Sequence, residues 1–243
     1  MSLLKRIAPL FSGWDETLIW SVLEGHMGFA LADDEQNPTS AQVAIGDICF
    51  FAGRPDEMLA AKAGAPELVP QDDGWCAAIE RVWGEKVQRR LRYAIKKEPD
   101  IFNRGTLQYY VDSLPEEYEL RLFDETIYAQ SFQERWSQDF CGCFNGCEDF
   151  MRRGLGAAVL HHGKLVSGAS SYSVYNGGFE IEIDTMPEYR QRGLATVCGA
   201  RLILEALKRG LYPSWDAFDL RSVALAEKLG YHVDHPYAMY SML

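Results

Sequence analysis

Apolar and polar positions alternate most regularly in the second half of the chain. One run predicts a strand at 118–123, and three further runs at 156–162, 164–175 and 179–185 predict a meander of antiparallel strands. The short segments between these three runs contain glycines, which tolerate the positive φ angles of tight turns. We therefore expect a largely antiparallel sheet in this part of the protein.

Helical periodicity and further strands surround the meander. In chain order, the pattern predicts a helix over about 124–137 that begins near Asp124, a helix over about 193–209 that ends at Gly210, a strand at 212–217, a helix over about 220–229 that ends at Gly230, and strand material at 231–242. Strands and helices mixed in this way predict an α/β domain over 116–243.

The first 115 residues carry a less regular pattern. It predicts a helix over 14–24 with Ser12 and Asp15 at the spacing of a capping box, strands within 27–32 and 42–53, and a helix over 75–94. We place the boundary at Leu114-Pro115, after which the pattern becomes regular. The sequence therefore predicts a smaller N-terminal α/β domain over 1–115.

The end of the predicted helix at 75–94 is strongly basic. Between residues 81 and 104 the chain carries eight arginines and lysines but only three acidic residues. One interpretation is a solvated helix face, and the other is a positive patch for the phosphates of an anionic ligand. The spacing of the residues does not decide between them.

Composition narrows the class of protein. Apolar residues make up 47% of the 243 residues and charged residues 24%, as in ordinary soluble proteins. No apolar run reaches the ~18 residues of a membrane-spanning helix. The opening MSLLKRIAPLFSGW lacks the features of a secretory signal peptide. We expect a cytoplasmic protein with no membrane partner.

Charge and cysteine content add two further expectations. The formal net charge of −11 makes the chain a poor general partner for nucleic acid. The cysteines are unevenly spread, at Cys49, Cys76, Cys141, Cys143, Cys147 and Cys198. The cluster at 141–147 offers three thiolates, but no further cysteine follows at zinc-finger spacing. We expect reduced packing cysteines and no metal, with a structural zinc site at 141–147 as the alternative.

The segment 180–207 carries the clearest chemistry. A predicted strand ends at Thr185, and a short loop leads into a long helix through an Arg190-x-x-Gly193-x-Ala195 sequence. The first N–H groups of a helix lack internal partners and lie at the positive end of its dipole. Gly193 and Ala195 let a pyrophosphate approach the backbone, and Arg190 and Arg192 add positive charge. The segment predicts an anion-binding loop.

The strand before this loop has one apolar and one acidic face. Its acidic face carries Glu180, Glu182 and Asp184. Charged groups on a central strand are costly unless they are solvated or paired. One interpretation is a wet face beside a cleft. The other is that Glu182, preferred over Glu180, is a base for an amine or binds a cationic amine.

Two motifs resemble the GNAT acetyltransferase superfamily. The first is RQRGLA at 190–195, preceded by Pro187-x-Tyr189, which is similar to the superfamily's Gln/Arg-x-x-Gly-x-Gly/Ala loop. The second is DLRSVALAEKLGY at 219–231, which is similar to the helix after the fifth strand. The resemblance covers about 118–243. The segments GLYPSWDA and LAEKLGY, with the extra N-terminal region, look like a bacterial two-domain GNAT subfamily.

This resemblance implies a mixed, mostly antiparallel sheet whose fourth and fifth strands splay apart, and acetyl-CoA as cosubstrate. In such enzymes the pantetheine arm bonds to the fourth strand where its neighbour has diverged. The implied acetyl-CoA-binding residues are Ile183, Asp184 and Thr185 for the pantetheine, Arg190, Gln191, Arg192, Gly193, Leu194, Ala195 and Thr196 for the pyrophosphate, and Asp219 and Ser222 on the other side.

Two positions depart from the pattern. Asp219 stands where many relatives have asparagine, and Ala226 stands where many have the tyrosine that protonates the leaving thiolate. The proton donor is therefore another residue or a water molecule, or the thiolate leaves without a donor. Tyr231, Tyr237 and Tyr240 are candidates by position, with Tyr231 foremost, although each also suits a packing role.

The resemblance implies an N-acetyltransferase that moves an acetyl group to a primary amine of a small molecule by direct attack in a ternary complex. The N-terminal domain is expected to shape the acceptor side. The alternative, motivated by Ala226, is a non-catalytic acyl-CoA-binding or sensor module. The sequence leaves the acceptor and the oligomeric state open.

Overall fold

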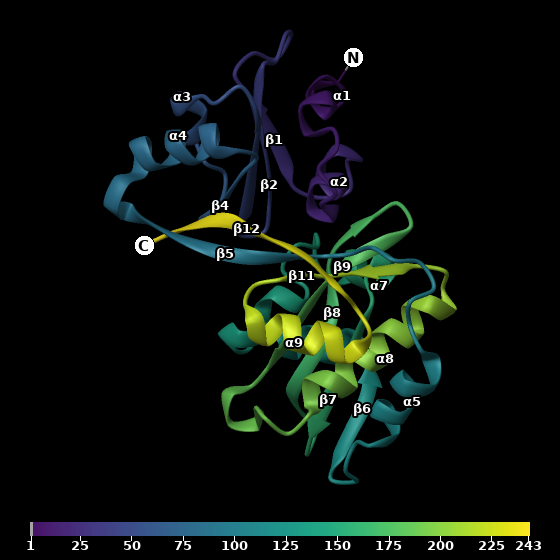
Figure 1. Ribbon diagram of the computed structural model, residues 1–243. Helices are drawn as coiled ribbons and strands as arrows, with labels where there is room; N and C mark the ends of the chain where they lie inside the picture. The colour runs from purple at the N-terminus through teal and green to yellow at the C-terminus, as the bar shows by residue number, and fades with distance from the viewer. Residues whose placement is uncertain (1) are drawn as a thin grey trace. The chain divides into compact units, whose positions relative to one another are not determined.

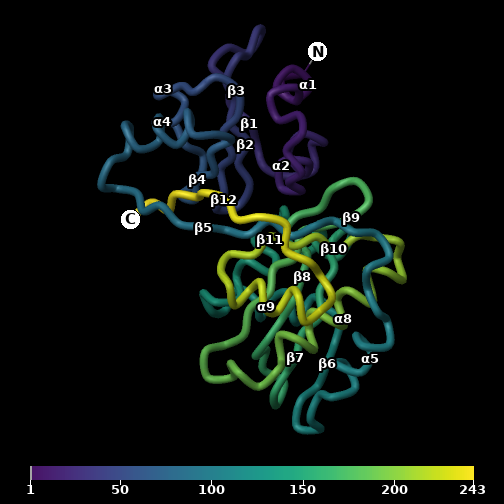
Figure 2. Tube along the Cα trace, in the orientation of Figure 1, coloured from purple at the N-terminus to yellow at the C-terminus, as the bar shows by residue number. Residues whose placement is uncertain are grey.

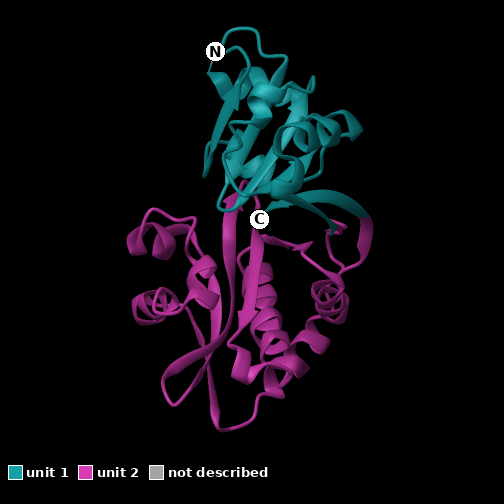
Figure 3. Cartoon of the chain, turned by 90° about the vertical axis from the view of Figure 1, so that its left-hand side faces the viewer, with its two compact units in different colours: residues 1–92, 236–243 teal, residues 93–235 magenta. Residues whose placement is uncertain are grey.

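The computed structural model describes residues 2–243, which form two compact units (Figures 1 and 3). Unit 1 contains the chain up to residue 92 together with Pro236–Leu243, and unit 2 is Tyr93–His235. The predicted boundary at 115/116 therefore falls inside unit 2. The reason is that helix α5 (Arg104–Asp112) packs against helix α8 (Leu194–Lys208) of the same unit. No helix within residues 2–243 combines the length and apolar character needed to cross a bilayer.

Unit 1 is built on a mixed sheet. Its strands lie in the order β1 (Phe29–Ala32), β2 (Ser40–Ile45), β3 (Ile48–Gly53), β4 (Glu67–Pro70), β12 (Val233–Met242) and β5 (Val87–Ile95). The helices of this unit are α1 (Leu3–Ile7), α2 (Thr17–Leu23), α3 (Glu57–Ala60) and α4 (Asp73–Trp83). The C-terminal strand thus returns to the first part of the chain, and its Tyr240 pairs with Leu68 of β4.

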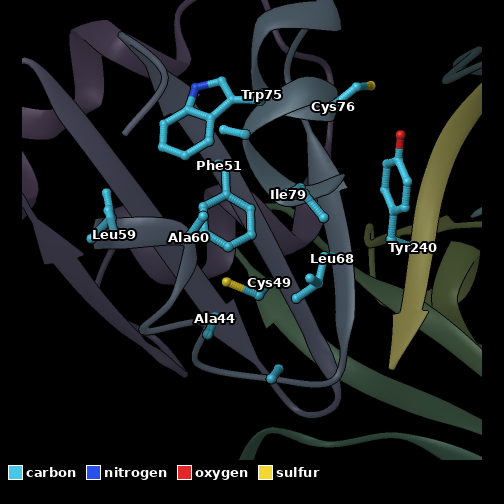
Figure 4. Close-up of a cluster of buried hydrophobic side chains, with 12 residues drawn as sticks. Ala44, Cys49, Phe51, Leu59, Ala60, Leu68, Trp75, Cys76, Ile79 and Tyr240 are labelled. Carbon is cyan, nitrogen blue, oxygen red and sulfur yellow. The ribbon is translucent and has the colours of Figure 1, made fainter. Parts of the chain in front are cut away.

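A cluster of buried side chains holds this unit together (Figure 4). Trp75 of α4 packs on Phe51 of β3 with 5.1 Å between ring centroids, and its Nε1 donates to the Gly53 carbonyl at 2.9 Å. Tyr240 joins the cluster from β12 and donates its hydroxyl to Glu80 at 2.5 Å. Large aromatic side chains of this kind bury much apolar area each, and their polar atoms need partners.

Three expectations for this region are wrong in detail. The predicted helix at 75–94 ends at Trp83, because Gly84 has a φ of +51°, and the basic residues that follow form strand β5 instead. The run at 42–53 is a hairpin of β2 and β3 rather than one strand. Helix α2 begins after Glu16, whose carboxylate accepts from the Leu18 N–H, so Ser12 is not its cap.

Unit 2 contains the predicted meander. Its sheet has the order β10 (Tyr212–Ser214), β9 (Gly178–Thr185), β8 (Lys164–Tyr175), β7 (Gly156–His161) and β6 (Tyr118–Leu122). Figure 2 labels all five strands. The strands from β6 to β9 are antiparallel, and β10 is parallel to β9. The expectation of a mixed, mostly antiparallel sheet is confirmed.

The helices of unit 2 agree less closely with the pattern. They are α5, α6 (Glu125–Ser131), α7 (Cys147–Arg153), α8 and α9 (Leu220–Leu229), with a 3-10 helix at Arg135–Phe140. Asp124 caps α6 as predicted, by accepting from the Ile127 N–H at 2.9 Å, but α6 is shorter than predicted. Gly230 closes α9 in the left-handed conformation, also as predicted.

Gly199 sets the close approach of α8 to the sheet. A Cβ at this position would lie 2.7 Å from Leu229 Cδ1 of α9 and 3.4 Å from Ile183 Cδ1 of β9. A larger residue would push both neighbours away. The small residue therefore holds α8 and α9 beside the second half of β9, where the candidate site lies.

Candidate active site

Strand β9 loses one of its two neighbours halfway along. Its parallel pairing with β10 ends where Ser214 lies opposite Glu180. After Trp215, the short strand β11 (Asp216–Ala217) pairs with Tyr93 and Ala94 of β5 instead. Residues 181–185 are therefore paired with β8 alone. This divergence is the splay that the resemblance implied.

Trp215 fixes the point of divergence. The residue is only 4% exposed, and its Nε1 donates to Ser222 Oγ of α9 at 3.0 Å. Its ring also packs edge-on against Tyr231 at 5.5 Å. The predicted acetyl-CoA-binding residue Ser222 thus has a structural partner as well, which orients its hydroxyl.

The loop after β9 presents a row of backbone donors. Gln191 and Gly193 both have left-handed φ angles, of +62° and +79°. Among residues 2–243, no backbone or side-chain acceptor takes the N–H groups of 191–196, and the first such bond of α8 runs from Val197 to the Gly193 carbonyl. Successive N–H groups around left-handed residues form an anion-binding concavity. This loop was predicted to have that chemistry.

Arg190 joins this loop to the end of β9. Its Nε donates to the Thr185 carbonyl at 3.0 Å, and its guanidinium pairs with Asp184 at 3.2 Å. Asp184 also accepts from the Thr185 N–H at 2.6 Å. The hydroxyl of Thr185 is buried against Ser167 at 2.7 Å. Arg190, Asp184 and Thr185 are therefore brought together, and Asp184 is partly neutralised.

Arg192 is anchored separately. Its guanidinium donates to the Glu188 carbonyl at 2.9 Å and to the Tyr118 hydroxyl at 3.1 Å, and it lies 4.9 Å from the centroid of the Tyr189 ring. These contacts hold its positive charge at the mouth of the loop. The other predicted loop residues lie in the first turn of α8, where Leu194 and Thr196 are buried and Ala195 is half-buried.

Asp219 has a structural role at the start of α9. It is the N-cap of α9 and accepts from the N–H groups of Arg221 and Ser222 at 2.9 and 3.0 Å. Burial alone would raise the pKa of Asp219, but hydrogen bonds from the Arg221 side chain and from the backbone outweigh it and lower that pKa. The carboxylate is therefore ionised and paired with Arg221.

The three acidic residues of β9 have different surroundings. Glu180 is only 5% exposed, and it lies opposite Ser173 of β8 and Ser214 of β10. Glu182 is half-buried, lies opposite Ser170 and is on the part of β9 beyond β10. Asp184 is bound to Arg190. Glu180 is thus the buried carboxylate at the point where the strands diverge.

Serines lie opposite Glu180 on both neighbouring strands, Ser173 on β8 and Ser214 on β10, and the sequence analysis did not identify them. The Tyr175 hydroxyl reaches across β9 to Ser214 Oγ at 2.7 Å. Gly178 allows this, because a Cβ there would lie 2.4 Å from the Tyr175 hydroxyl. The sequence feature that could have indicated these groups is the set of serines in KLVSGASSYSVY, because they are polar residues at buried positions of a central strand.

The candidate proton donors belong to different units of the chain. Tyr231 is buried and donates to the Pro213 carbonyl at 2.6 Å. Its pKa is raised well above the ordinary value by burial, with Tyr212, Glu180 and Tyr175 adding to the effect. Tyr240 belongs to the core of unit 1, and Tyr237 lies on β12 in the same unit. Ala226 is fully buried.

All six cysteines are free thiols. Burial raises the pKa of Cys141 and of Cys198 to about 12, so both stay protonated near neutral pH. Within residues 2–243, no group of three or more histidine, cysteine or acidic side chains is arranged to hold a metal ion.

A splayed mixed sheet with a donor-rich loop at a helix N-terminus defines an acyltransferase of the GNAT type. Comparison with known proteins agrees. The family model of the GNAT acetyltransferases matches residues 8–240, and the chain belongs to this family. The match includes unit 1, where the sequence analysis found no superfamily motif. The protein is therefore a GNAT acetyltransferase.

Relatives of the whole chain carry the same description. The chain is 28% identical to the "Uncharacterized N-acetyltransferase YdfB" of Bacillus subtilis (strain 168), over 97% of this chain and 95% of that protein. It is 46% identical to a crystal structure of a GCN5-related N-acetyltransferase-like protein from Streptococcus suis 89/1591, with a TM-score of 0.95 over 99% of this chain and 98% of that one. A GCN5-related N-acetyltransferase from Kribbella flavida shares the fold at 14% identity and a TM-score of 0.53, over 84% of this chain and 86% of that one.

Proposed function

We propose that this protein transfers the acetyl group of acetyl-CoA to a primary amine of a small molecule by direct attack in a ternary complex. The observation that carries the proposal is the run of N–H groups at 191–196 directly after a strand whose edge has lost its neighbour. The first feature suits a pyrophosphate, and the second suits an extended amide-containing arm. Both features lie on one continuous segment of the chain.

The direction of β9 relates the donor-rich loop to the open edge of the strand. The loop follows Thr185, and the strands diverge at Glu180. Five residues of extended strand span roughly 16 Å. An arm that starts at the loop and runs along this edge ends near Glu180, and its thioester lies there. The register therefore favours Glu180 over Glu182 as the base, in contrast to the preference drawn from the sequence.

The proposed reaction needs few groups of the protein. Glu180 accepts a proton from the amine, directly or through water, and the neutral nitrogen attacks the thioester carbonyl carbon. A C–N bond forms, the C–S bond breaks with its electron pair leaving on sulfur, and the nitrogen releases its second proton to water, which leaves a neutral amide. A thiol is far more acidic than an alcohol, so sulfur is a competent leaving group without a dedicated acid. Water protonates it, which is consistent with Ala226 and with the engaged hydroxyl of Tyr231.

The net charge of −11 supports a small cationic acceptor rather than nucleic acid. The protein would then act without a membrane or nucleic-acid partner. A buried carboxylate beside the proposed thioester position provides a counter-charge for an ammonium group.

The test combines binding and turnover. Calorimetry should show CoA binding, and thiol release from acetyl-CoA should depend on an added primary amine. An absence of CoA binding would contradict the proposal. Tight CoA binding without turnover across an amine panel would instead support a non-catalytic acyl-CoA sensor, which the small buried Ala226 favours.

A further inference from the structure

Strand β8 contains four fully buried serines, at positions 167, 170, 171 and 173. Three of them have hydrogen-bond partners. Ser167 bonds to Thr185, Ser170 donates to the Phe140 carbonyl at 2.6 Å, and Ser171 bonds to both backbone groups of Leu155. The hydroxyl of Ser173 has no hydrogen-bond partner within residues 2–243.

An unpartnered buried hydroxyl lowers the stability of the folded state, and the fold of β8 does not need a hydroxyl at this position. A buried polar group without a hydrogen bond destabilises the folded state, and alanine would fill nearly the same space. Ser173 is 0% exposed, so bulk water does not reach it. Each buried unsatisfied group in a native protein needs an explanation, and a catalytic role is one of the recognised ones.

The register directs this hydroxyl to the candidate site. The pairing of β8 and β9 shifts between Ser171 and Ser173, so that Ser173 lies directly opposite Glu180. Directly opposed residues share one face of a sheet and have Cβ atoms about 5 Å apart. A shift of this type re-aims side chains next to functional sites. Without it, Ser173 would be on the face opposite to that of Glu180.

The other flank of Glu180 differs from this one. Ser214 lies opposite Glu180 on β10, but its hydroxyl is bonded to that of Tyr175 at 2.7 Å. The unpartnered hydroxyl beside Glu180 is therefore on the β8 side, within the described residues. A donor bound at Glu180 would find its second acceptor there.

We infer that Ser173 Oγ and the Glu180 carboxylate together bind the nitrogen of a primary amine acceptor. This inference rests on the proposed function and identifies the groups that select the acceptor. An ammonium group has three N–H donors, so it can bond to Glu180 and to Ser173 at the same time and still carry one further N–H. When Glu180 takes its proton, the bond to Ser173 keeps the nitrogen oriented for attack. A tertiary amine offers a single donor and is excluded.

The experiment compares Ser173→Ala with Ser171→Ala, a matched change on the same strand. The acceptor probes are propylamine, 1,4-diaminobutane and N,N-dimethylpropylamine, with turnover measured as thiol release from acetyl-CoA and binding as the shift in Tm of the CoA-saturated protein. We expect the two primary amines to bind and react, and the tertiary amine to do neither. Ser173→Ala should raise KM for the primary amines about 10- to 100-fold. Its KM for acetyl-CoA should not change.

The Tm of the variants distinguishes a binding role of Ser173 from a structural one. Ser173→Ala removes an unpaired hydroxyl, so its Tm without ligands should equal or exceed that of the wild type. Ser171→Ala breaks buried bonds to Leu155, so its Tm should fall while KM for the amine stays within about 2-fold.

The outcomes separate the two claims. Failure of CoA to bind contradicts the proposed function itself. If CoA binds but neither primary amine binds or reacts, or if Ser173→Ala leaves KM for the amine unchanged, the inference about Ser173 is wrong while the CoA site stands. A lower Tm for Ser173→Ala would show that its hydroxyl serves the fold, and would also overturn the inference.

Discussion

The two ends of β9 present different parts of the chain. At its C-terminal end, consecutive backbone N–H groups at 191–196 form the donor-rich loop, and two left-handed residues orient them. At the other end, the groups around Glu180 are side chains of three strands, with Ser173 from β8 and Ser214 from β10. The first arrangement depends on backbone conformation, and the second depends on register and on side-chain identity.

This difference has a consequence for specificity. Backbone groups bind an anion with little dependence on side chains, which suits a cosubstrate shared by many enzymes. Side chains from separate strands can change one at a time without altering the fold. We therefore expect the loop end to tolerate side-chain changes that preserve φ, and the Glu180 end to be sensitive to the loss of single atoms.

The largest effect is expected at the side-chain end. Glu180→Gln keeps the shape but removes the proton acceptor, so kcat should fall by about 10²- to 10⁴-fold while CoA affinity is nearly unchanged. Raising the pH should partly restore kcat, because more of the amine is then neutral in solution. The measurement is kcat against pH with a confirmed acceptor.

Glu182→Gln is the matched control for this prediction. Glu182 is half-buried on the part of β9 beyond β10, so its substitution should lower kcat much less. A larger effect for Glu182→Gln would restore the preference drawn from the sequence. Wild-type pH profiles for both variants would place the base on another element.

The next largest effect is expected in the loop. Gly193 has a φ of +79°, and a Cβ there would meet nothing within 4 Å, so the constraint is conformational rather than steric. Valine is strongly disfavoured at such a φ. Gly193→Val should displace the N–H groups and weaken CoA binding at least ~10-fold, as the loss of one charge-assisted hydrogen bond would.

Gly193→Asn is the control, since asparagine adopts left-handed φ angles more readily. It should lose less CoA affinity than the valine variant, as measured by calorimetry. Unchanged CoA affinity in a folded Gly193→Val protein would remove the loop from the site.

A smaller effect is expected at the cap of α9. Asp219→Ala removes two backbone hydrogen bonds and should destabilise the protein by about 1 kcal/mol, whereas Asp219→Asn keeps the cap. The folded-state pKa of Asp219 is lowered, so its ionic contribution is present above the unfolded pKa of about 3.9 and is lost as the pH falls through the lower, folded value.

Urea denaturation of these Asp219 variants at several pH values tests this. The difference in stability between wild type and Asp219→Asn should shrink below about pH 4. A difference that does not change with pH would mean that the pair with Arg221 contributes nothing to stability.

The smallest effect on activity is expected for Tyr231→Phe. The hydroxyl donates to the Pro213 carbonyl, so its removal should cost about 1 kcal/mol of stability and change kcat by less than about 3-fold. Chemical denaturation and steady-state kinetics measure the two quantities. A fall in kcat comparable to that of Glu180→Gln would make Tyr231 the proton donor after all.

Local patterns predicted the elements whose signals are local. The meander, the cap at Asp124 and the stop at Gly230 were all predicted, because strand alternation and capping depend on neighbours in sequence. The helix at 75–94 was wrong because its apolar spacing suits a helix, while β5 is stabilised by pairing with β12, more than 130 residues away. Tertiary pairing of this kind overrides local propensity.

The backbone arrangement of the loop at 190–196, a strand end followed by a glycine and a helix start, was determined by the sequence itself. Its donors are consecutive backbone groups, so a strand end, one glycine and a helix start suffice to predict it. The surroundings of Glu180 were decided only by the tertiary structure. Alternation predicts that Glu180 and Glu182 share a face, but which of them lies where the strands diverge depends on the β9–β10 register. The pairing shift that brings Ser173 opposite Glu180 also involves residues distant in sequence, because strand register is set by packing across the whole sheet.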